Sequence, residues 1–367
     1  MRLTLTALLL SGFSILFIAC ESDFRPLAEG NTREVLVVMD STKWDSETAE
    51  AIRDVFGKWV NTLPNAEPYY DLSFTQISSQ SQLERIKRHK NIIFAAPIEE
   101  ESNTGRQIRG FLDENLEQRV REDESFAFPV EEQWYRDQYV LILTSTSDSA
   151  LAQKIRNTER SLLSDMLDKE LKRWEYFVYE QYEQTQYSDS LWKNHGFKVR
   201  FQHDYIKNVD TLNFQTYRRA LPQNDRWMWI WWKNDVPDIS FLDNNWINTT
   251  RDSLSQHYIK GSRDDMYVNT YFNRPDLRPV ITESFQKGRL LAYETRGTWH
   301  MVNGAMAGPF VNFTYYDPDT DRLFMIEYSQ FAPSVRKKLP FVRQFRAMGR
   351  TFQSDSTWTP EKEEPNL

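Results

Sequence analysis

Three polar side chains, Glu294, Arg296 and His300, alternate along one predicted strand and are the first candidates for a chemical site. Successive side chains of a strand point to opposite faces, so these three share one face. A carboxylate, a guanidinium and an imidazole on one face could line a polar cleft, with Trp299 or Asn303 near its end. The alternative is the solvated face of an antiparallel sheet, and we favour that simpler interpretation.

Histidine and cysteine do not form a metal-binding pattern in this chain. The five histidines include no H-E-x-x-H spacing, and the sequence has one cysteine. The run DPDTDR (317–322) resembles the start of a calcium loop, but Arg322 stands where the loop needs glycine. A type I hairpin turn built on Pro318 is expected instead. We therefore expect no metal and no other cofactor.

Known catalytic signatures are also missing from the sequence. The chain contains no G-x-S-x-G elbow, phosphate loop or dinucleotide-binding fingerprint. Carboxylates are plentiful, yet none can be assigned an acid or base role without geometry. We lean against an enzyme and leave the question open.

Four tryptophans fall within six positions of the run RWMWIWWK (226–233). In a strand, Trp227, Trp229 and Trp231 face one way, and Met228, Ile230 and Trp232 face the other. Three tryptophans about 7 Å apart could stack on sugars. Because both faces are apolar, we predict a core strand covered on both sides. Trp227 and Trp232, near the ends of the run, are the candidates for reaching a groove.

A positive stripe lies near the end of this acidic chain. It consists of Arg336, Lys337, Lys338, Arg343, Arg346 and Arg350. Such a stripe could meet anionic headgroups or polysaccharide. The simpler interpretation, which we adopt, is the hydrated side of an amphipathic helix.

Length and charge limit the classes of function. The 367 residues are enough for two domains, with 40% apolar and 27% charged residues to build a core in each. The formal net charge of −8 would repel a polyanion, so we expect no nucleic-acid partner.

The first twenty residues, MRLTLTALLLSGFSILFIAC, read as a secretion signal over residues 1–19 that ends at Cys20. FIAC resembles the lipobox of bacterial lipoproteins, in which the cysteine becomes the lipidated first residue. Phe17 departs from the leucine that is usual there. Acyl chains contribute about 0.8 kcal/mol per buried methylene, so several of them anchor a protein stably. We expect a lipid anchor at Cys20, followed by a tether over residues 20–33.

The first half of the chain predicts an α/β domain over residues 34–195. Strands are predicted over EVLVVMD, DLSFTQI, NIIFAAP and QYVLILTS, and helices over residues 46–63, 81–90 and 105–122. A long helical signal runs from residue 147 to 187, with Ser147 as its cap and Gly196 ending the region. We expect this helix to pack on the sheet of its own domain. A coiled coil is the alternative, but the heptads are not strict.

After Gly196 the pattern becomes β-rich. Strands are predicted over residues 197–202, 212–220, 226–233, 279–286, 290–302, 309–317 and 322–331, and helices around residues 250–261 and after Pro340. This predicts an antiparallel sheet domain with packed helices over residues 196–352, and an α+β class for the whole chain. Residues 353–367 are predicted to be a disordered tail.

Two C-terminal stretches resemble a known family. GTWHMVNGAMAGPFVNFTYYD and RLFMIEYSQFAPSVRKKLPFVRQFRAM are similar to the C-terminal half of a Bacteroidota lipoprotein family known only as domain of unknown function 4837. Its Arg-Gly-x-Trp strand and Met-Gly-Gly-Pro-Phe turn are matched by Arg296, Gly297, Trp299, Met306, Gly308, Pro309 and Phe310. EVLVVMDSTKWDSETAEAIRDVF and LPNAEPYYDLS resemble the family's N-terminal half, so the resemblance extends over nearly the whole mature chain.

Two positions depart from the family pattern. Ala307 stands in place of the first glycine of the turn, and Gly304 stands where an aspartate is common. An essential acid or base at that position would leave this member inactive. A tight turn at Asn303-Gly304 needs no acid, and we favour the turn. The resemblance implies no established activity.

Six Asp-Ser or Asp-Thr triplets resemble the O-glycosylation sites of exported Bacteroidota proteins. They contain Ser41, Ser149, Ser190, Thr211, Ser253 and Ser356. Helix caps and turns use the same dipeptides. We hypothesise that several of the six are glycosylated.

Taken together, the sequence predicts an outer-membrane lipoprotein of the cell envelope that faces the periplasm or the cell surface. It would act without catalysis, by binding or as part of an assembly with envelope proteins or glycans. A carbohydrate-binding surface lipoprotein is the first alternative, and a hydrolase with an unrecognised site is the second.

Overall fold

A computed structural model describes residues 23–270 and 276–358 and divides them into two compact units. Unit 1 comprises residues 23–46 and 73–151, and unit 2 comprises residues 47–72 and 152–358. This division differs from the predicted boundary at residue 195, because the second sheet shares one apolar cluster with Val60, Leu63, Val178 and Leu191.

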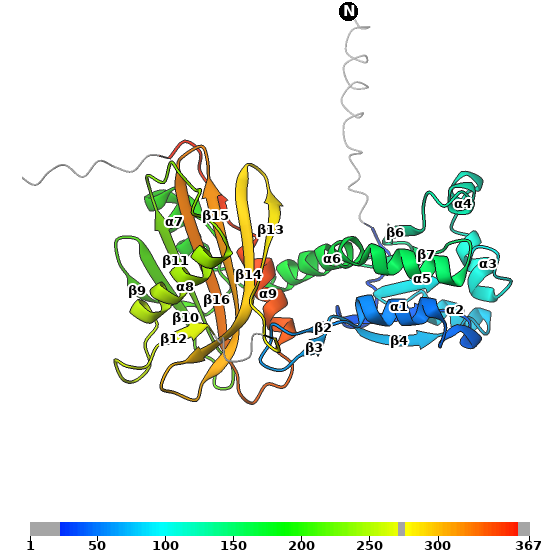
Figure 1. The fold of residues 1–367 in the computed structure, drawn as a ribbon, viewed down its shortest axis with the longest axis horizontal. Coiled ribbons are helices and arrows are strands. Elements are labelled where there is room, and N and C mark those ends of the chain that lie inside the picture. The colour runs from blue at the N-terminus through cyan, green and yellow to red at the C-terminus, as the bar shows by residue number, and fades with distance from the viewer. Residues whose placement is uncertain (1–22, 271–275, 359–367) are drawn as a thin grey trace, which may run out of the picture. The chain divides into compact units, whose positions relative to one another are not determined.

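Unit 1 is built on a five-stranded sheet (Figure 1). Its strands lie in the order β4 (Asp71–Thr75), β1 (Glu34–Val38), β5 (Asn91–Ala95), β7 (Tyr139–Leu143) and β6 (Ala127–Glu131). β1, β5 and β7 are parallel neighbours, and β6 runs antiparallel to β7 at the edge. The four predicted strands are confirmed. β6 was missed because it is only half buried and contains Pro129, so it has no continuous apolar run.

The helical elements of unit 1 are short and connect these strands. They are η1 (Ser41–Lys43), α2 (Gln80–Ile86), α3 (Asn103–Arg109), α4 (Glu114–Arg121) and the start of α5 (Asp148–Asn157). The single helix predicted over residues 105–122 is wrong. α3 ends at Gly110, and the Asp113 side chain starts α4 by accepting from the Leu116 amide at 2.8 Å.

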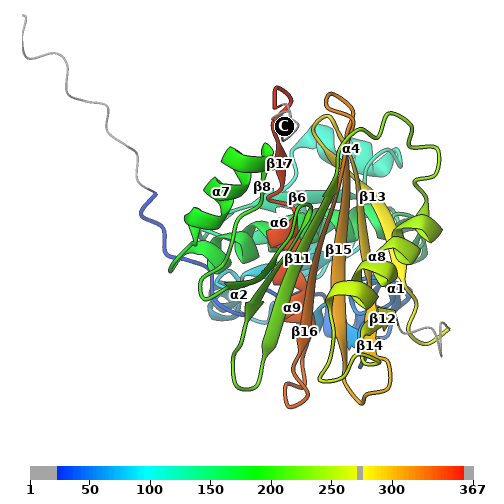
Figure 2. The same cartoon turned by 90° about the vertical axis from the view of Figure 1, so that its left-hand side faces the viewer.

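Unit 2 is built on an eight-stranded sheet whose neighbouring strands are all antiparallel (Figure 2). In spatial order its strands are β12 (Val268–Thr270), β14 (Leu290–Met301), β15 (Ala307–Asp317), β16 (Arg322–Phe331), β11 (Asp225–Lys233), β10 (Phe214–Arg219) and β9 (Ile206–Asp210). β13 (Ile281–Lys287) also pairs with β14. The α+β class is confirmed. β9 and β12 were missed because they are short and carry few apolar residues.

Five helices lie in unit 2 within the described residues, in addition to most of α5. They are α1 (Glu47–Phe56), α6 (Glu159–Tyr179), α7 (Thr185–His195), α8 (Asn244–Tyr258) and α9 (Leu339–Gly349). α9 packs on one face of the sheet and α8 on the other.

The long helical signal of residues 147–187 is divided into α5, α6 and α7. The second break occurs because the Gln184 amide pairs with the Phe201 carbonyl at 3.0 Å instead of continuing a helix. Ser147 accepts from the Ala150 amide at 3.2 Å, and Gly196, at φ +63°, ends α7, so both predicted helix signals are confirmed. α6 packs on α9 through Leu167 and therefore belongs to the core of unit 2. The expectation that this helix packs on the first sheet is wrong.

The tryptophan-rich strand is β11, and its two faces enter different cores. Met228, Ile230 and Trp232 pack with α9, whereas Trp229 packs with α8. β11 lies between β10 and β16 and is therefore no edge strand. The prediction of a strand covered on both sides is confirmed.

A small hairpin in unit 2 replaces the end of a predicted helix. The helix expected over residues 46–63 ends at Phe56, and β2 (Trp59–Val60) then pairs with β3 (Glu67–Pro68). Burial of Val60 in the core around α9 outweighs the local helical pattern.

The prediction of disorder from residue 353 onward is wrong for residues 353–358. Gln353 and Ser354 form β17, which pairs with β8 (Phe197–Lys198). The Trp358 ring lies 4.3 Å from the guanidinium carbon of Arg322, a cation–π contact that holds residues 353–358 in place. Residues 359–367 lie outside the described residues.

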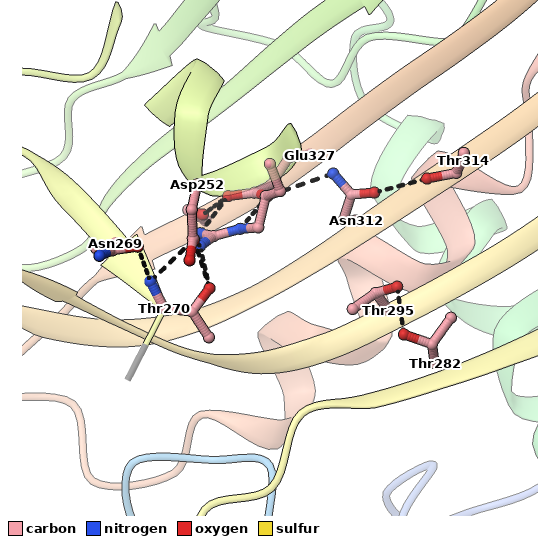
Figure 3. A network of polar contacts seen from close by, with 10 residues as sticks. Asp252, Asn269, Thr270, Thr282, Thr295, Asn312, Thr314 and Glu327 are labelled. Carbon is pink, nitrogen blue, oxygen red and sulfur yellow. Dashed lines mark hydrogen bonds and ion pairs between the residues drawn. The ribbon is translucent and has the colours of Figure 1, made fainter. Parts of the chain in front are cut away.

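A buried polar network fixes α8 to the sheet (Figure 3). Arg251 of α8 donates to both carboxylate oxygens of Glu327 at 2.7 and 2.8 Å, and both side chains are fully buried. A third guanidinium nitrogen of Arg251 donates to Thr270 at 2.9 Å and to Asp252 at 2.8 Å. Asn312 donates to Glu327 at 3.4 Å. The partners satisfy one another, so we assign this network a structural role.

Substituting Glu327→Ala should destabilise unit 2 strongly. The change leaves Arg251 buried without its main counter-charge, which costs about 3–5 kcal/mol. Breaking the exposed pair of Arg218 and Asp225 with Arg218→Ala is the control and should cost less than about 1 kcal/mol. Urea denaturation followed by tryptophan fluorescence measures both, and equal small losses would contradict the assignment.

Candidate functional site

A cleft of about 450 Å³ lies within unit 2. It is bounded by the β2–β3 hairpin, the first half of α6, the paired strands β13 and β14, and α9. The charged and phenolic side chains that line it are Tyr69, Glu159, Glu283, Glu294, Lys58, Arg160, Arg296, Arg346 and Arg350. Because most of them are cations, the chemistry of the cleft is dominated by positive charge.

The hairpin is fastened to α9 and to β14. The Glu67 carboxylate accepts from the amides of Lys338 and Leu339 at 2.5 and 3.0 Å, and so caps the start of α9. Thr298 of β14 donates to the Thr62 carbonyl at 3.1 Å. These bonds place Tyr69, directly after β3, against the cations of α9 and β14.

Glu294 is the anionic centre of the cluster. Its carboxylate lies 2.5 Å from Nε of Arg346 and 3.3 Å from a nitrogen of Arg296 and of Arg350. Burial alone raises the pKa of a carboxyl group, but these three guanidinium groups outweigh it and lower the pKa of Glu294 to about 2. Glu294 is therefore ionised at every physiological pH.

Arg346 is buried without a full set of partners. Its side chain is 4% exposed and lines the cleft, and its one ion pair among the described residues is with Glu294. Nε of Arg346 is engaged by Glu294, whereas Nη1 has no hydrogen-bond partner among those residues. Burial lowers the pKa of Arg346 to about 10 despite the neighbouring carboxylate. A guanidinium kept charged in this position has an unused donor at Nη1.

The buried charges of the cluster do not balance. Arg296, Arg343 and Arg346 are buried cations, and Glu294 and Glu170 are the buried carboxylates that face them. Arg343 pairs with Glu170 at 3.5 Å. The exposed Glu283 adds a second partner for Arg296 at the edge of the cleft. Among the buried groups alone the cations exceed the carboxylates by one, and Glu283 at the surface balances that charge. A bound anion could pair with Nη1 of Arg346, which has no hydrogen-bond partner in the described part of the chain.

The positive charges of the cluster also act on Tyr69. Its hydroxyl lies 3.4 Å from Nη1 of Arg296, and the Arg343 guanidinium carbon lies 4.7 Å from the centre of its ring. Burial raises the pKa of Tyr69, but the charges of Arg296, Arg343 and Arg346 outweigh burial and lower it to about 8. At pH 7 the phenol is neutral, so the cleft keeps its positive charge.

The structure brings together only part of the predicted site. Glu294 and Arg296 do share a face, but they are buried beneath α9, so the solvated face that we favoured is wrong for them. His300 is partly exposed, and burial lowers its pKa. Trp299 points to the opposite face, where its ring packs 5.0 Å from that of Trp227.

Trp232 is 3% exposed and packs 5.3 Å from the ring of Phe197 in the core. Trp227 is partly buried in another cluster on the α8 side of the sheet. The two candidates for a groove therefore face opposite cores and do not meet.

The interpretation of the positive stripe as the hydrated side of a helix is wrong for half of its members. Arg336 and Lys337 are exposed, but Lys338, Arg343 and Arg346 are buried. α9 is enclosed by the sheet on one side and α6 on the other, so it has little hydrated surface. Arg346 and Arg350 turn into the cleft.

Tyr69 and Glu170 were not singled out from the sequence. Neither stands in a periodic pattern, and the stretch LPNAEPYYDLS that contains Tyr69 assigns it no role. The one available signal was an excess of arginine on a helix that is otherwise strongly apolar.

The two predicted turns behave as turns. Asp317 is buried and pairs with Arg289 at 2.7 Å, and residues 318–321 connect β15 to β16. Asn303 has a φ of +53° between β14 and β15. Within residues 23–270 and 276–358, no three His, Cys, Asp or Glu side chains are grouped as a metal site.

The predicted modification sites can be placed only in part. Cys20 lies outside the described residues, as do the signal sequence and the start of the tether. The six candidate glycosylation positions are all exposed, namely Ser41, Ser149, Ser190, Thr211, Ser253 and Ser356. None of the helices in the described part of the chain has the length and apolarity needed to cross a membrane.

Two family models match the chain. Residues 184–351 match a domain of unknown function (DUF4837), and residues 28–178 match another domain of unknown function (DUF8532). The resemblance to the first therefore holds for the C-terminal half, which contains α9 and β14. The expectation that it extends over nearly the whole mature chain is wrong. No curated protein matches the sequence.

The similarity to solved structures is low. The Saccharomyces cerevisiae Ran-binding protein Mog1p is 8% identical with a TM-score of 0.29, over 43% of this chain and 90% of that chain. Human StAR-related lipid transfer protein 5 is 9% identical with a TM-score of 0.21, over 49% and 92%. These values are too low to carry a functional inference.

Tyr69 should ionise near pH 8, below the ordinary value of about 10 for tyrosine. Phenolate absorbance in the near ultraviolet, measured as wild type minus Tyr69→Phe, should show this midpoint. Between pH 8 and 10 the folded chain holds fewer protons than the unfolded chain, so the contribution of Tyr69 to the free energy of unfolding rises with pH. A midpoint at or above the ordinary value would show that the cluster carries no excess positive charge.

Proposed function

We propose that the protein is a lipid-anchored component of the cell envelope that binds an anionic ligand in the cleft of unit 2, without catalysis. Lipidation at Cys20 would hold it at the outer membrane. The cleft would then present its guanidinium groups to a ligand in the periplasm or at the cell surface.

The observation that carries the proposal is the buried Arg346, whose Nη1 has no hydrogen-bond partner among the described residues. Guanidinium groups bind carboxylates and phosphates through charge-assisted hydrogen bonds, which are stronger than neutral ones. Arg346 is 4% exposed, yet it lines an open cleft, so an anion can reach it from solvent. Natural cores rarely leave such a buried donor without a hydrogen-bond partner unless a function requires it.

The state of the cleft carboxylate argues against hydrolysis. A glycoside hydrolase needs a carboxylic acid that is still protonated near neutral pH. The arginines lower the pKa of Glu294 to about 2, so it has no proton to donate. Carbohydrate binding also loses support, because Trp229 and Trp232 are buried and do not form a platform.

Substituting Arg346→Met should abolish anion binding and leave the fold intact. Calorimetric titration of the purified mature chain with acetate and with phosphate should show at least about a tenfold loss of affinity, because a charged hydrogen bond contributes about 1.5–3 kcal/mol. The control Arg218→Met changes an exposed arginine outside the cleft. Glu294 keeps Arg296 and Arg350 as partners in the variant, so the urea midpoint should fall only slightly. A strong loss of stability together with unchanged affinity would make Arg346 a structural residue.

The lipid anchor and the glycans can be tested in one measurement. The intact mass of the protein from its native host should exceed that of the chain from Cys20 onward by acyl groups at Cys20 and by glycans on some of the six exposed Asp-Ser and Asp-Thr sites. Cys20→Ala should remove the acyl mass and release the protein from membranes. A mass increase from lipid alone would exclude glycosylation, and continued membrane fractionation of the variant would exclude the anchor.

A further inference from the structure

We infer that the ligand of this cleft is an organic monocarboxylate with an apolar body, whose carboxylate pairs with Arg346 and whose body lies against Trp59 and Ile281. This inference rests on the proposed anion-binding function and narrows it to a chemical class. Three properties of the cleft support it: its charge, its size and the apolar side chains at its mouth.

The charge of the cleft fits a single negative charge. The buried cluster has one guanidinium more than it has buried carboxylates. Glu294 stays ionised at the bottom of the cleft, and Glu283 of β13 lies opposite it in the strand register. Two fixed carboxylates repel a ligand that carries several negative charges. A carboxylate also matches the planar, two-pronged geometry of a guanidinium.

The size of the cleft exceeds what a small inorganic anion needs. A volume of about 450 Å³ lies within the range of pockets that hold organic ligands. The head of the ligand would fill only the inner end near Arg346. The remaining space must be occupied by the body of the ligand, by water or by both.

The lining away from the arginines is apolar. Trp59 of β2 is 61% exposed although it lines the cleft, and Ile281 of β13 is 38% exposed. Leu163 of α6 and Phe285 of β13 also contribute to the wall. Apolar side chains left open to water beside a cationic end favour a ligand that is itself amphipathic. Lys58 and Glu159 lie on the same wall as an exposed ion pair, with 2.5 Å between their charged atoms. Because their charges cancel, they would not attract a second charged group on the ligand.

The β2–β3 hairpin connects the two ends of this binding site. It carries Trp59 on its first strand and Tyr69 directly after its second, and Glu67 fixes it to α9. The hairpin and its hydrogen bonds to α9 therefore set the distance between the apolar wall and the cationic end, so the site should prefer one length of ligand over shorter and longer ones.

A ligand series on the purified mature chain tests the inference. Acetate, 4-phenylbutyrate, 4-phenylbutan-1-ol, phenyl phosphate and inorganic phosphate are titrated by calorimetry. We expect 4-phenylbutyrate to bind at least about tenfold more tightly than acetate, a difference of about 1.4 kcal/mol. We expect 4-phenylbutan-1-ol, which has no charge, to bind at least about tenfold more weakly than 4-phenylbutyrate.

Variants locate the apolar wall. Trp59→Ala and Ile281→Ser should each reduce the ratio between 4-phenylbutyrate and acetate affinities to less than about threefold. Trp192→Ala is the matched control, because Trp192 is also exposed in unit 2 but does not line the cleft, and it should keep the wild-type ratio. Both cleft residues are at the surface, so their truncation leaves the core intact.

The outcomes separate this inference from the proposed function. Equal affinities for acetate and 4-phenylbutyrate would overturn the apolar body and leave the anion site standing. Tighter binding of phenyl phosphate than of the carboxylate would overturn the single charge. Equal binding of the alcohol and the acid would overturn the role of the carboxylate. Failure of all the anions to bind would overturn the proposed function itself.

Discussion

A buried imbalance of charge beneath α9 is the constraint around which the second unit is built. Glu294 forms ion pairs with three arginines, and a fourth arginine, Arg343, pairs with Glu170 of α6. Charges in a low-dielectric interior are tolerated only when other elements bring partners to them. α6, α9 and β14 are therefore joined by charge as well as by apolar packing. The same charges that connect these elements leave the cleft cationic, so stability and binding depend on the same side chains.

The fold followed from the sequence wherever local pattern and tertiary packing agree. β11 is the clearest case, because two apolar faces can only mean a strand covered on both sides. The pattern failed where distant contacts decide. Val60 and Leu63 fit a helical face, yet the chain leaves the helix at Phe56 because these residues are buried in a core formed by residues far away in the sequence. No window of local sequence contains that information.

The site was predicted only in fragments. Arg296 and Glu294 were named as one face of a strand, and Arg346 as part of a positive stripe, but nothing in the sequence indicated that β14 and α9 meet. Charged residues are usually exposed, so the hydrated interpretation was the reasonable one for both. Tyr69 has no pattern at all. Its importance comes from a hairpin that Glu67 ties to a helix 271 positions later.

The hydrogen bonds between Glu67 and the start of α9 affect the order in which the chain folds. Residues 47–72 are synthesised early. The residues that hydrogen-bond to Pro64, Thr62 and Glu67 follow them by 214, 236 and 271 positions in the sequence. Contacts of such high sequence separation form late, because the intervening chain must first be closed into a loop. The first segment of unit 2 therefore precedes the larger part of unit 1, residues 73–151, and Val60 and Leu63 stay unburied while that part is synthesised. Unit 2 can therefore complete its fold only after α9 has been synthesised, late in the sequence.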